Sequence, residues 1–261
     1  MCATCGCGDT TDHGHGHDGD HAHAHQHHHD DLPHVHPRQT SRTLRLEQDV
    51  LAKNADLAQR NRAWLEARGI LAWNLMSSPG AGKTTLLERT VRELGAEVPF
   101  GVIEGDQATF RDAERMRAAG CPVVQINTGS GCHLDADMVA DALRQLAPPA
   151  RSVVIIENVG NLVCPALFDL GERARAVLMS VTEGDDKPLK YPHMFRASDL
   201  MILTKVDLLP YVEFDVARCR EYARRVNPQL EIVELSATRG HGVEAWYALL
   251  RARTGARATA G

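Results

Sequence analysis

Residues 71–84 read Leu71-Ala72-Trp73-Asn74-Leu75-Met76-Ser77-Ser78-Pro79-Gly80-Ala81-Gly82-Lys83-Thr84. The apolar first half of this stretch predicts a buried strand, and a helical pattern begins at its end. A glycine-rich turn between a strand and a helix lets backbone N–H groups and the positive end of the helix dipole surround phosphate oxygens. The usual pattern is G-x-x-x-x-G-K-S/T, and here Ser77 replaces the first glycine while Lys83 and Thr84 are present.

This loop predicts a nucleoside triphosphate site. Lys83 can reach the β- and γ-phosphates, and the Thr84 hydroxyl is a ligand for Mg²⁺. Asp106 and Glu157 lie at the ends of predicted strands, where α/β sheets bind their ligands, so either carboxylate can hold the ion or orient the attacking water. The alternative for each is an exposed loop carboxylate. Catalytic roles are assigned to Lys83, Thr84, Asp106 and Glu157, and nucleotide contacts to Gly80, Ala81, Gly82, Lys83, Thr84 and Thr85.

Apolar runs alternate with amphipathic stretches along the rest of the chain, which indicates βαβ units. The predicted strands are Leu71–Met76, Pro99–Glu104, Val123–Asn127, Ser152–Glu157, Ala176–Thr182, Leu200–Leu203 and Glu231–Leu235. The predicted helices are Leu44–Arg68, Thr84–Leu94, Phe110–Ala119, Asp135–Leu146, Asp215–Val226 and Val243–Arg253. The expected fold is α/β, a P-loop NTPase with a mostly parallel sheet flanked by helices.

Composition divides the chain into segments. Residues 1–37 hold six Asp and no Lys or Arg, with almost nothing apolar to bury, and predict a disordered, cation-binding tail. A helical lead-in is expected over 38–69, the P-loop GTPase domain over 70–255, and a disordered C-terminus over 256–261.

Charge and hydropathy exclude several classes of protein. The chain has 261 residues and a formal net charge of -5, and its basic residues form no run that would predict a nucleic-acid partner. It contains no apolar stretch long enough to cross a membrane and no secretory leader, so we expect a cytoplasmic protein with no membrane partner.

The choice of base is indicated by Thr204-Lys205-Val206-Asp207, which resembles the N-K-x-D motif of GTPases. Asp207 can accept hydrogen bonds from guanine N1–H and the exocyclic amine, whereas adenine has no donor at N1 and would leave the carboxylate unpaired. Thr204 stands in place of the usual Asn, so one supporting hydrogen bond is in question. Ser236 and Ala237 resemble the motif that backs the guanine from the other side. An ATPase is the alternative if adenine binds better than guanine.

Two groups of soft ligands lie in the N-terminal tail. Cys2, Cys5 and Cys7 are three thiols within six residues, a chelate suited to Ni²⁺ or Zn²⁺. The run from His13 to His36 holds eleven of the fourteen histidines, and imidazole suits the same ions. A solvated spacer is the alternative for this run. The assigned imidazole ligands are His13, His15, His17, His21, His23, His25, His27, His28 and His29.

A third metal group is predicted inside the globular domain. Cys132 and His133 lie in one loop and Cys164 in another, and both loops are expected to follow strands that flank the nucleotide. Water or a second subunit can complete this set of three ligands. Cys121 and Cys219 are interpreted as small buried hydrophobes.

Taken together, these motifs resemble the HypB family, the GTPases that help to deliver nickel during [NiFe]-hydrogenase maturation. The resemblance rests on Cys2-x-x-Cys5-Gly6-Cys7, on the segments around 104–107, 127–135 and 157–165, and on residues 183–192. It implies a GTP-dependent homodimer with Cys132, His133 and Cys164 near the subunit interface. It also implies a HypA-type nickel chaperone and the hydrogenase large subunit as partners.

The predicted function is therefore a GTP-hydrolysing nickel metallochaperone that uses GTP, Mg²⁺ and Ni²⁺, with Zn²⁺ an alternative at the inner site. Nucleotide state and metal affinity are expected to influence each other. One competing hypothesis is a nickel storage or buffering protein with a secondary nucleotide site. Another is a urease-type nickel GTPase, although that family has a Cys-Pro-His motif, whereas here Cys132 adjoins His133.

Overall fold

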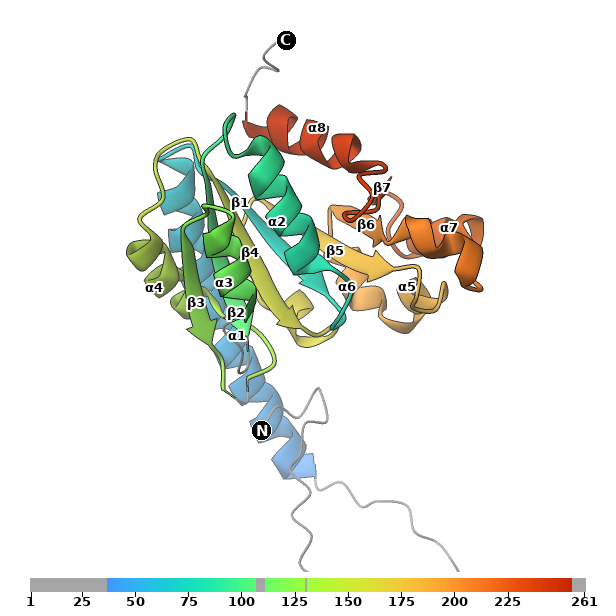
Figure 1. Ribbon diagram of the computed structural model, residues 1–261. Helices are drawn as coiled ribbons and strands as arrows, with labels where there is room; N and C mark the ends of the chain where they lie inside the picture. Colours follow the sequence, from blue (N-terminus) through green and yellow to red (C-terminus); the bar gives the residue numbers. More distant parts are fainter. Residues whose placement is uncertain (1–36, 107–110, 130, 255–261) are drawn as a thin grey trace, which may run out of the picture. The chain divides into compact units, whose positions relative to one another are not determined.

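The computed structural model describes residues 37–106, 111–129 and 131–254 (Figure 1). The predictions for the cysteines and histidines of residues 1–36 and for the C-terminus at 256–261 lie outside the described residues. The chain divides into two compact units, Met1–Val50 and Leu51–Gly261. The described residues of the first unit are the beginning of helix α1 (Pro37–Glu66), and the second unit contains the fold described below.

Seven strands of the described chain form one sheet in which every pairing is parallel. Their order is β3-β2-β4-β1-β5-β6-β7. The strands are β1 (Leu71–Ser77), β2 (Phe100–Asp106), β3 (Val123–Asn127), β4 (Val153–Gly160), β5 (Ala174–Ser180), β6 (Leu200–Thr204) and β7 (Glu231–Glu234). Because β4 lies between β2 and β1, the ends of these three strands meet where a phosphate-binding loop would place its ligand.

Helices cover both faces of this sheet (Figure 1). Helices α2 (Lys83–Leu94), α3 (Arg111–Ala118) and α8 (Val243–Thr254) pack on one face. On the other face, α4 (Ala136–Leu146) and the C-terminal part of α1 cover β2, β4 and β1, while α6 (Pro192–Arg196) and α7 (Val216–Val226) cover β5 and β6. Strands β1 and β6 are buried along their whole length, which explains their nearly continuous apolar sequences.

The C-terminal part of α1 is attached through buried amides as well as apolar contacts. The Asn54 side chain donates to the Asp169 carbonyl and accepts from the Ala136 N–H, at 2.7 and 2.8 Å. Asn61 donates to the carbonyls of Ala136 and Leu170. These bonds join α1 to the start of α4 and to the segment that precedes β5. They therefore hold the β3–α4 connection, which carries Cys132, and the β4–β5 connection, which carries Cys164.

The structure confirms the predicted α/β fold and its parallel sheet. The predicted boundaries were less accurate: β4 continues past Glu157 to Gly160, β5 lies two residues earlier than predicted, and α1 begins at Pro37 rather than Leu44. The sequence prediction missed two short helices, α5 (Lys187–Lys190) and α6. Both are too short to show helical periodicity, and each has proline in its first turn.

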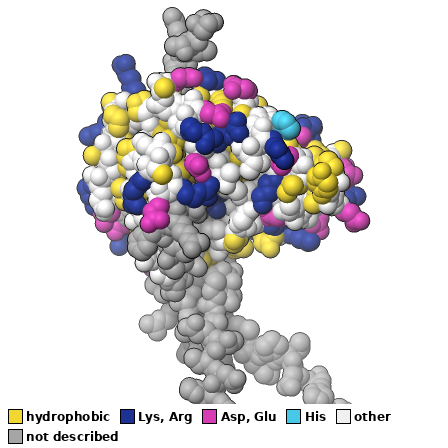
Figure 2. Space-filling model, in the orientation of Figure 1, with side chains coloured by type: hydrophobic (Ala, Val, Ile, Leu, Met, Phe, Trp, Pro, Cys, Tyr) yellow, Lys and Arg dark blue, Asp and Glu magenta, His cyan; other side chains and the backbone are white. Residues whose placement is uncertain are grey.

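Surface and hydropathy features agree with this architecture. Within the described part of the chain, no helix is both long and apolar enough to cross a bilayer. On the face drawn in Figure 2, Lys and Arg side chains are interspersed with Asp and Glu, so the described residues there form no broad surface of a single charge.

We expect Trp246→Ala to destabilise the domain by about 3–5 kcal/mol, because it leaves a large cavity. Trp246 is fully buried in α8, stacks edge-on against Trp73 at a centroid distance of 5.2 Å, and donates from Nε1 to Thr90 Oγ1 at 3.0 Å. Urea unfolding followed by circular dichroism measures the loss. Tyr211→Ala is the control, since Tyr211 is 83% exposed and its removal should change stability by less than about 0.5 kcal/mol. Equal effects of the two substitutions would contradict this packing.

Candidate functional site

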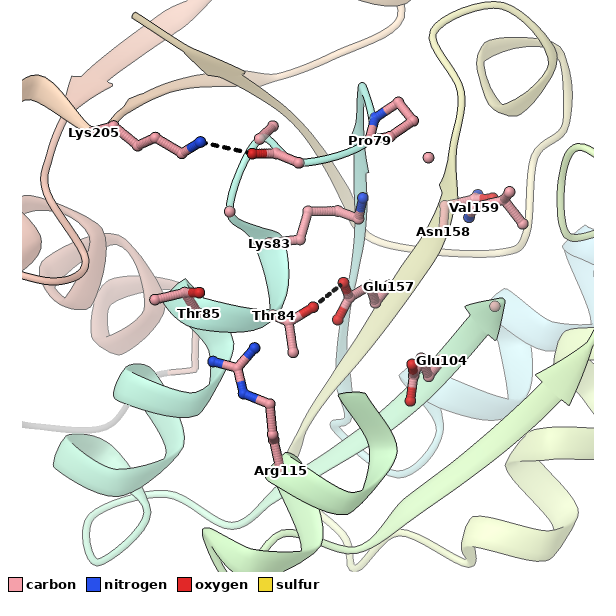
Figure 3. Close-up of a pocket in the computed structure, with 15 residues that line it drawn as sticks. Pro79, Lys83, Thr84, Thr85, Glu104, Arg115, Glu157, Asn158, Val159 and Lys205 are labelled. Carbon is pink, nitrogen blue, oxygen red and sulfur yellow. Dashed lines mark hydrogen bonds between the residues drawn. The ribbon is translucent and has the colours of Figure 1, made fainter. Parts of the chain in front are cut away.

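The turn between β1 and α2 has the shape of a phosphate-binding loop. Gly82 precedes α2 with φ of 96°, a conformation that other residues rarely adopt. Lys83 Nζ donates to Ser77 Oγ at 2.7 Å, so the serine that replaces the first glycine of the pattern holds the lysine side chain. Thr84 Oγ1 donates to Glu157 Oε1 at 2.9 Å, which brings two oxygens predicted to serve Mg²⁺ together (Figure 3).

A pocket of about 540 Å³ opens above this loop. The predicted residues from Gly80 to Thr85 line it together with Glu157 and Lys205. The sequence prediction did not include four other residues of its wall, which come from β2, α3 and β4: Glu104, Arg115, Asn158 and Val159. Arg115 points toward the Thr84 side of the pocket (Figure 3) and also forms an ion pair with Glu88 at 2.6 Å.

Asp106 and Glu157 differ in how far the structure tests them. Asp106 is the last residue of β2, but its side chain lies outside the described residues. Glu157 is 5% exposed and faces Thr84. It was predicted to end its strand, which is wrong, because β4 continues for three more residues. Glu157 is therefore held by the sheet rather than by a loop.

A second, smaller pocket of about 260 Å³ adjoins the first through Gly82, Thr85 and Lys205. Asp207 lines it, and its Oδ1 atom is buried with no hydrogen-bond partner among the described residues. A buried carboxylate oxygen without a donor is costly, and a planar ligand with adjacent N–H groups would supply what it lacks. Lys205 lies along the same wall, with Nζ donating to the Gly80 carbonyl at 2.8 Å.

The remaining residues predicted for base binding also surround this second pocket. Thr204 Oγ1 donates to the Ala81 carbonyl at 2.7 Å, so the residue that replaces Asn connects β6 to the phosphate-binding loop. Ala237 lines the pocket, and its carbonyl accepts from Arg89 at 2.9 Å. Ser236 is buried beneath it, where its hydroxyl accepts the Arg239 N–H and stabilises the turn.

Cys132, His133 and Cys164 converge as the sequence predicted. Their ligand atoms all lie within 4.8 Å of one another, and the two sulfur atoms are 2.9 Å apart. Cys164 is 1% exposed and Cys132 is 9% exposed. Two sulfurs and an imidazole that converge in this way are a donor set that suits Zn²⁺ or Ni²⁺. A fourth position is left for another ligand.

The route by which Cys132 reaches this cluster differs from the prediction. Its loop follows β3, which is an edge strand of the sheet and does not border the nucleotide pocket. The loop instead returns across the end of β2, where Leu134 packs on Gly105. A Cβ atom at Gly105 would lie 2.9 Å from the Leu134 side chain, so any larger residue there would force Leu134 to shift. Only the loop of Cys164 follows a strand, β4, that borders the pocket.

Burial adjusts the chemistry of the imidazole and of the other thiols. His133 stacks on Phe168 at a centroid distance of 3.8 Å, and burial lowers its pKa, which favours the neutral form that binds metals. Cys121 and Cys219 are buried away from this cluster, and desolvation raises the pKa of each to about 12. These two thiols therefore stay protonated near neutral pH and are poor metal ligands.

Comparisons with known proteins agree with this arrangement. A model of the nucleotide-binding domain of CobW, HypB and UreG proteins matches residues 71–234. The hydrogenase maturation factor HypB of Escherichia coli (strain K12) is 57% identical over 213 residues, which cover 82% of this chain and 73% of that protein. The structure of a hydrogenase maturation factor HypB from Archaeoglobus fulgidus is 42% identical, with a TM-score of 0.73, and the match covers 78% of this chain and 99% of that one. The structure of HypB from Helicobacter pylori in complex with nickel is 38% identical, with a TM-score of 0.71, and the match covers 80% of this chain and 99% of that one.

We expect Cys164→Ala to weaken cobalt binding at the inner cluster and to reduce its thiolate-to-metal absorption strongly, because one of its two sulfurs is removed. The measurement is a cobalt titration followed by absorption, in full-length protein that carries Cys2→Ser, Cys5→Ser and Cys7→Ser. The matched control is Cys219→Ala, which also removes a buried thiol but lies outside the cluster and should leave the bands unchanged. Equal loss in both variants would show that the bands report general unfolding.

Proposed function

The chain belongs to the HypB family of hydrogenase maturation factors, and from that premise we propose that it hydrolyses GTP and couples the reaction to the binding and delivery of nickel. Its domain is the nucleotide-binding domain of CobW, HypB and UreG proteins. The observation that carries the proposal is the position of Asp207 Oδ1, buried without a donor among the described residues in a pocket that adjoins the phosphate-binding loop.

Guanine is the base that fits this second pocket. Guanine presents N1–H and the exocyclic amine side by side, and the two oxygens of Asp207 can accept both. Adenine presents no donor at N1 and would leave a buried carboxylate oxygen unpaired. The base would lie against the aliphatic part of Lys205, with Ala237 on the opposite side of the pocket.

The larger pocket supplies the groups that phosphoryl transfer needs. Lys83 moves from Ser77 Oγ to the β- and γ-phosphate oxygens, where its charge stabilises the transition state. Thr84 and Glu157 are oxygen ligands 2.9 Å apart and fit Mg²⁺, which neutralises the charge that develops on the phosphates. Glu157 and Asp106 orient the attacking water. Arg115 borders the same pocket and adds a second positive charge.

Nickel is the cargo rather than a resident cofactor in this proposal. Cys132, His133 and Cys164 hold the ion at the inner site, where Zn²⁺ is an alternative, and a homodimer or water completes the coordination. A HypA-type chaperone would exchange the metal with this site on its way to the hydrogenase large subunit. Residues 1–37 would store further ions. The support for nickel is the soft donor set and the likeness to a relative solved in complex with that ion.

Lys83→Ala is expected to weaken the binding of a non-hydrolysable GTP analogue about 10- to 100-fold. Hydrogen bonds to charged groups contribute about 1.5–3 kcal/mol, and about 1.4 kcal/mol corresponds to a factor of ten. Calorimetric titration measures binding, and phosphate release measures hydrolysis. Lys53→Ala is the control, since Lys53 is exposed on α1. Unchanged binding and hydrolysis in the Lys83 variant would refute the assignment of the pocket.

Asp207→Asn is expected to exchange a preference for guanine for a preference for xanthine. Xanthine keeps N1–H but carries a carbonyl in place of the amine, which matches the oxygen and the amide N–H of Asn. Competition of GTP, XTP, ITP and ATP for a fluorescent nucleotide measures the order of affinity. Asp56→Asn provides a control at an exposed carboxylate. Tighter binding of ATP than of GTP to the parent protein would overturn the choice of base.

A further inference from the structure

One buried side chain, Asn158, contacts the structural elements of both sites. It is 1% exposed, lies in β4 directly after Glu157, and belongs to the wall of the larger pocket. Its Oδ1 atom accepts the Val159 N–H at 2.9 Å and the Leu134 N–H at 3.3 Å. Leu134 directly follows His133, so this single oxygen touches both the strand that leads to Cys164 and the loop that carries the other two metal ligands.

The orientation of the Asn158 amide is determined by its partners. Two backbone N–H groups can only donate, so the amide oxygen must face them and Nδ2 must point the other way. Nδ2 donates to Asn74 Oδ1 at 3.2 Å, and Asn74 Nδ2 donates to Glu172 Oε1 at 3.1 Å. Glu172 also accepts from Arg175 at 2.5 Å, so the series ends on an ion-paired carboxylate. A reversed amide would place two donors against each other.

This series joins two neighbouring strands and the metal-binding loop of Cys132. Asn74 lies in β1, three residues before Ser77 and the phosphate-binding loop. Asn158 lies in β4, beside the carboxylate that bonds Thr84. Leu134 lies in the loop that brings Cys132 across from the edge strand. A shift of β4 caused by a different occupant of the nucleotide pocket therefore moves Oδ1 relative to the metal-binding loop.

The bond to Leu134 is the one most easily changed. Its length of 3.3 Å exceeds the usual length of about 2.9–3.0 Å for an N–H···O bond, whereas the bond to the adjacent Val159 N–H is of ordinary length. A small displacement can strengthen or break a bond of this length. Such a change moves the Leu134 backbone, and with it the ligands of the adjacent residues, relative to Cys164.

We propose that Asn158 is the positioning residue that connects the nucleotide in the larger pocket with the geometry of Cys132, His133 and Cys164. This inference rests on the proposed function, because it requires that the two sites bind a guanine nucleotide and a metal ion. The nucleotide and the metal then change each other's affinity by the same factor, since coupling is reciprocal.

The test uses full-length protein with Cys2→Ser, Cys5→Ser and Cys7→Ser as the parent. Histidines of the tail give no thiolate absorption and the other two thiols stay protonated, so the near-ultraviolet bands of bound cobalt report Cys132 and Cys164 alone. Cobalt affinity is measured with GDP and with a non-hydrolysable GTP analogue, and nucleotide affinity is measured with and without cobalt. We expect the two nucleotides to change cobalt affinity at least about fivefold in the parent.

In Asn158→Ala this ratio should fall to about one, while the variant still binds nucleotide and cobalt separately. Asn158→Ser is a second variant with the same expected result, because its hydroxyl is too short to reach Leu134. The matched control is Asn227→Ala, which removes an amide that donates to the Phe195 and Ser198 carbonyls, outside both sites.

A ratio retained in both Asn158→Ala and Asn158→Ser would overturn the role of this residue. A ratio of one in the parent, with normal binding of each ligand, would overturn the coupling but leave the GTPase and nickel proposal standing. Failure of the parent to bind guanine nucleotides, or to show thiolate bands, would refute the proposed function and this inference with it.

Discussion

Strand β4 is the element on which both candidate sites depend. It lies between β1 and β2 and is buried on both faces, so its position is determined by two parallel ladders. Successive residues of a strand point to opposite faces. Glu157 therefore faces Thr84 on the side of α2, and Asn158 faces Leu134 on the side of α4. Two adjacent residues of β4 therefore supply a carboxylate to the nucleotide pocket and an amide to a metal-binding loop.

The parts of the site that could be predicted are those in which neighbouring residues act together. The strand, turn and helix of the phosphate-binding loop are contiguous, and Lys205 and Asp207 are separated by one residue, so their patterns are visible in one dimension. Arg115 and Asn158 could not be found this way, because the packing of α3 brings Arg115 to the pocket and the pleat of β4 turns the Asn158 amide toward Leu134. The edge position of β3 could not be predicted from the sequence either, since strand order depends on contacts between residues that are distant in sequence.

Two departures from the usual motifs have local explanations in the structure. At Ser77 a hydroxyl stands in place of the usual glycine, and it accepts a hydrogen bond from the Lys83 ammonium. A hydroxyl also replaces the amide at Thr204, where it bonds the Ala81 carbonyl. Each substitution keeps a polar atom in contact with the phosphate-binding loop.

The inner cluster of Cys132, His133 and Cys164 suits the release of an ion that the proposed function requires. Structural zinc sites close their coordination with four protein ligands, whereas this one presents three within the described chain. Its ligands lie on connections held by Asn54, Asn61 and Asn158 rather than within strands. Side-chain amide bonds to backbone contribute only about 0.5–1.5 kcal/mol each, so such connections can move without breaking the sheet. Under the proposed function, small movements of β4 and of these adjustable loops would let the energy of nucleotide binding change metal affinity while the fold stays intact.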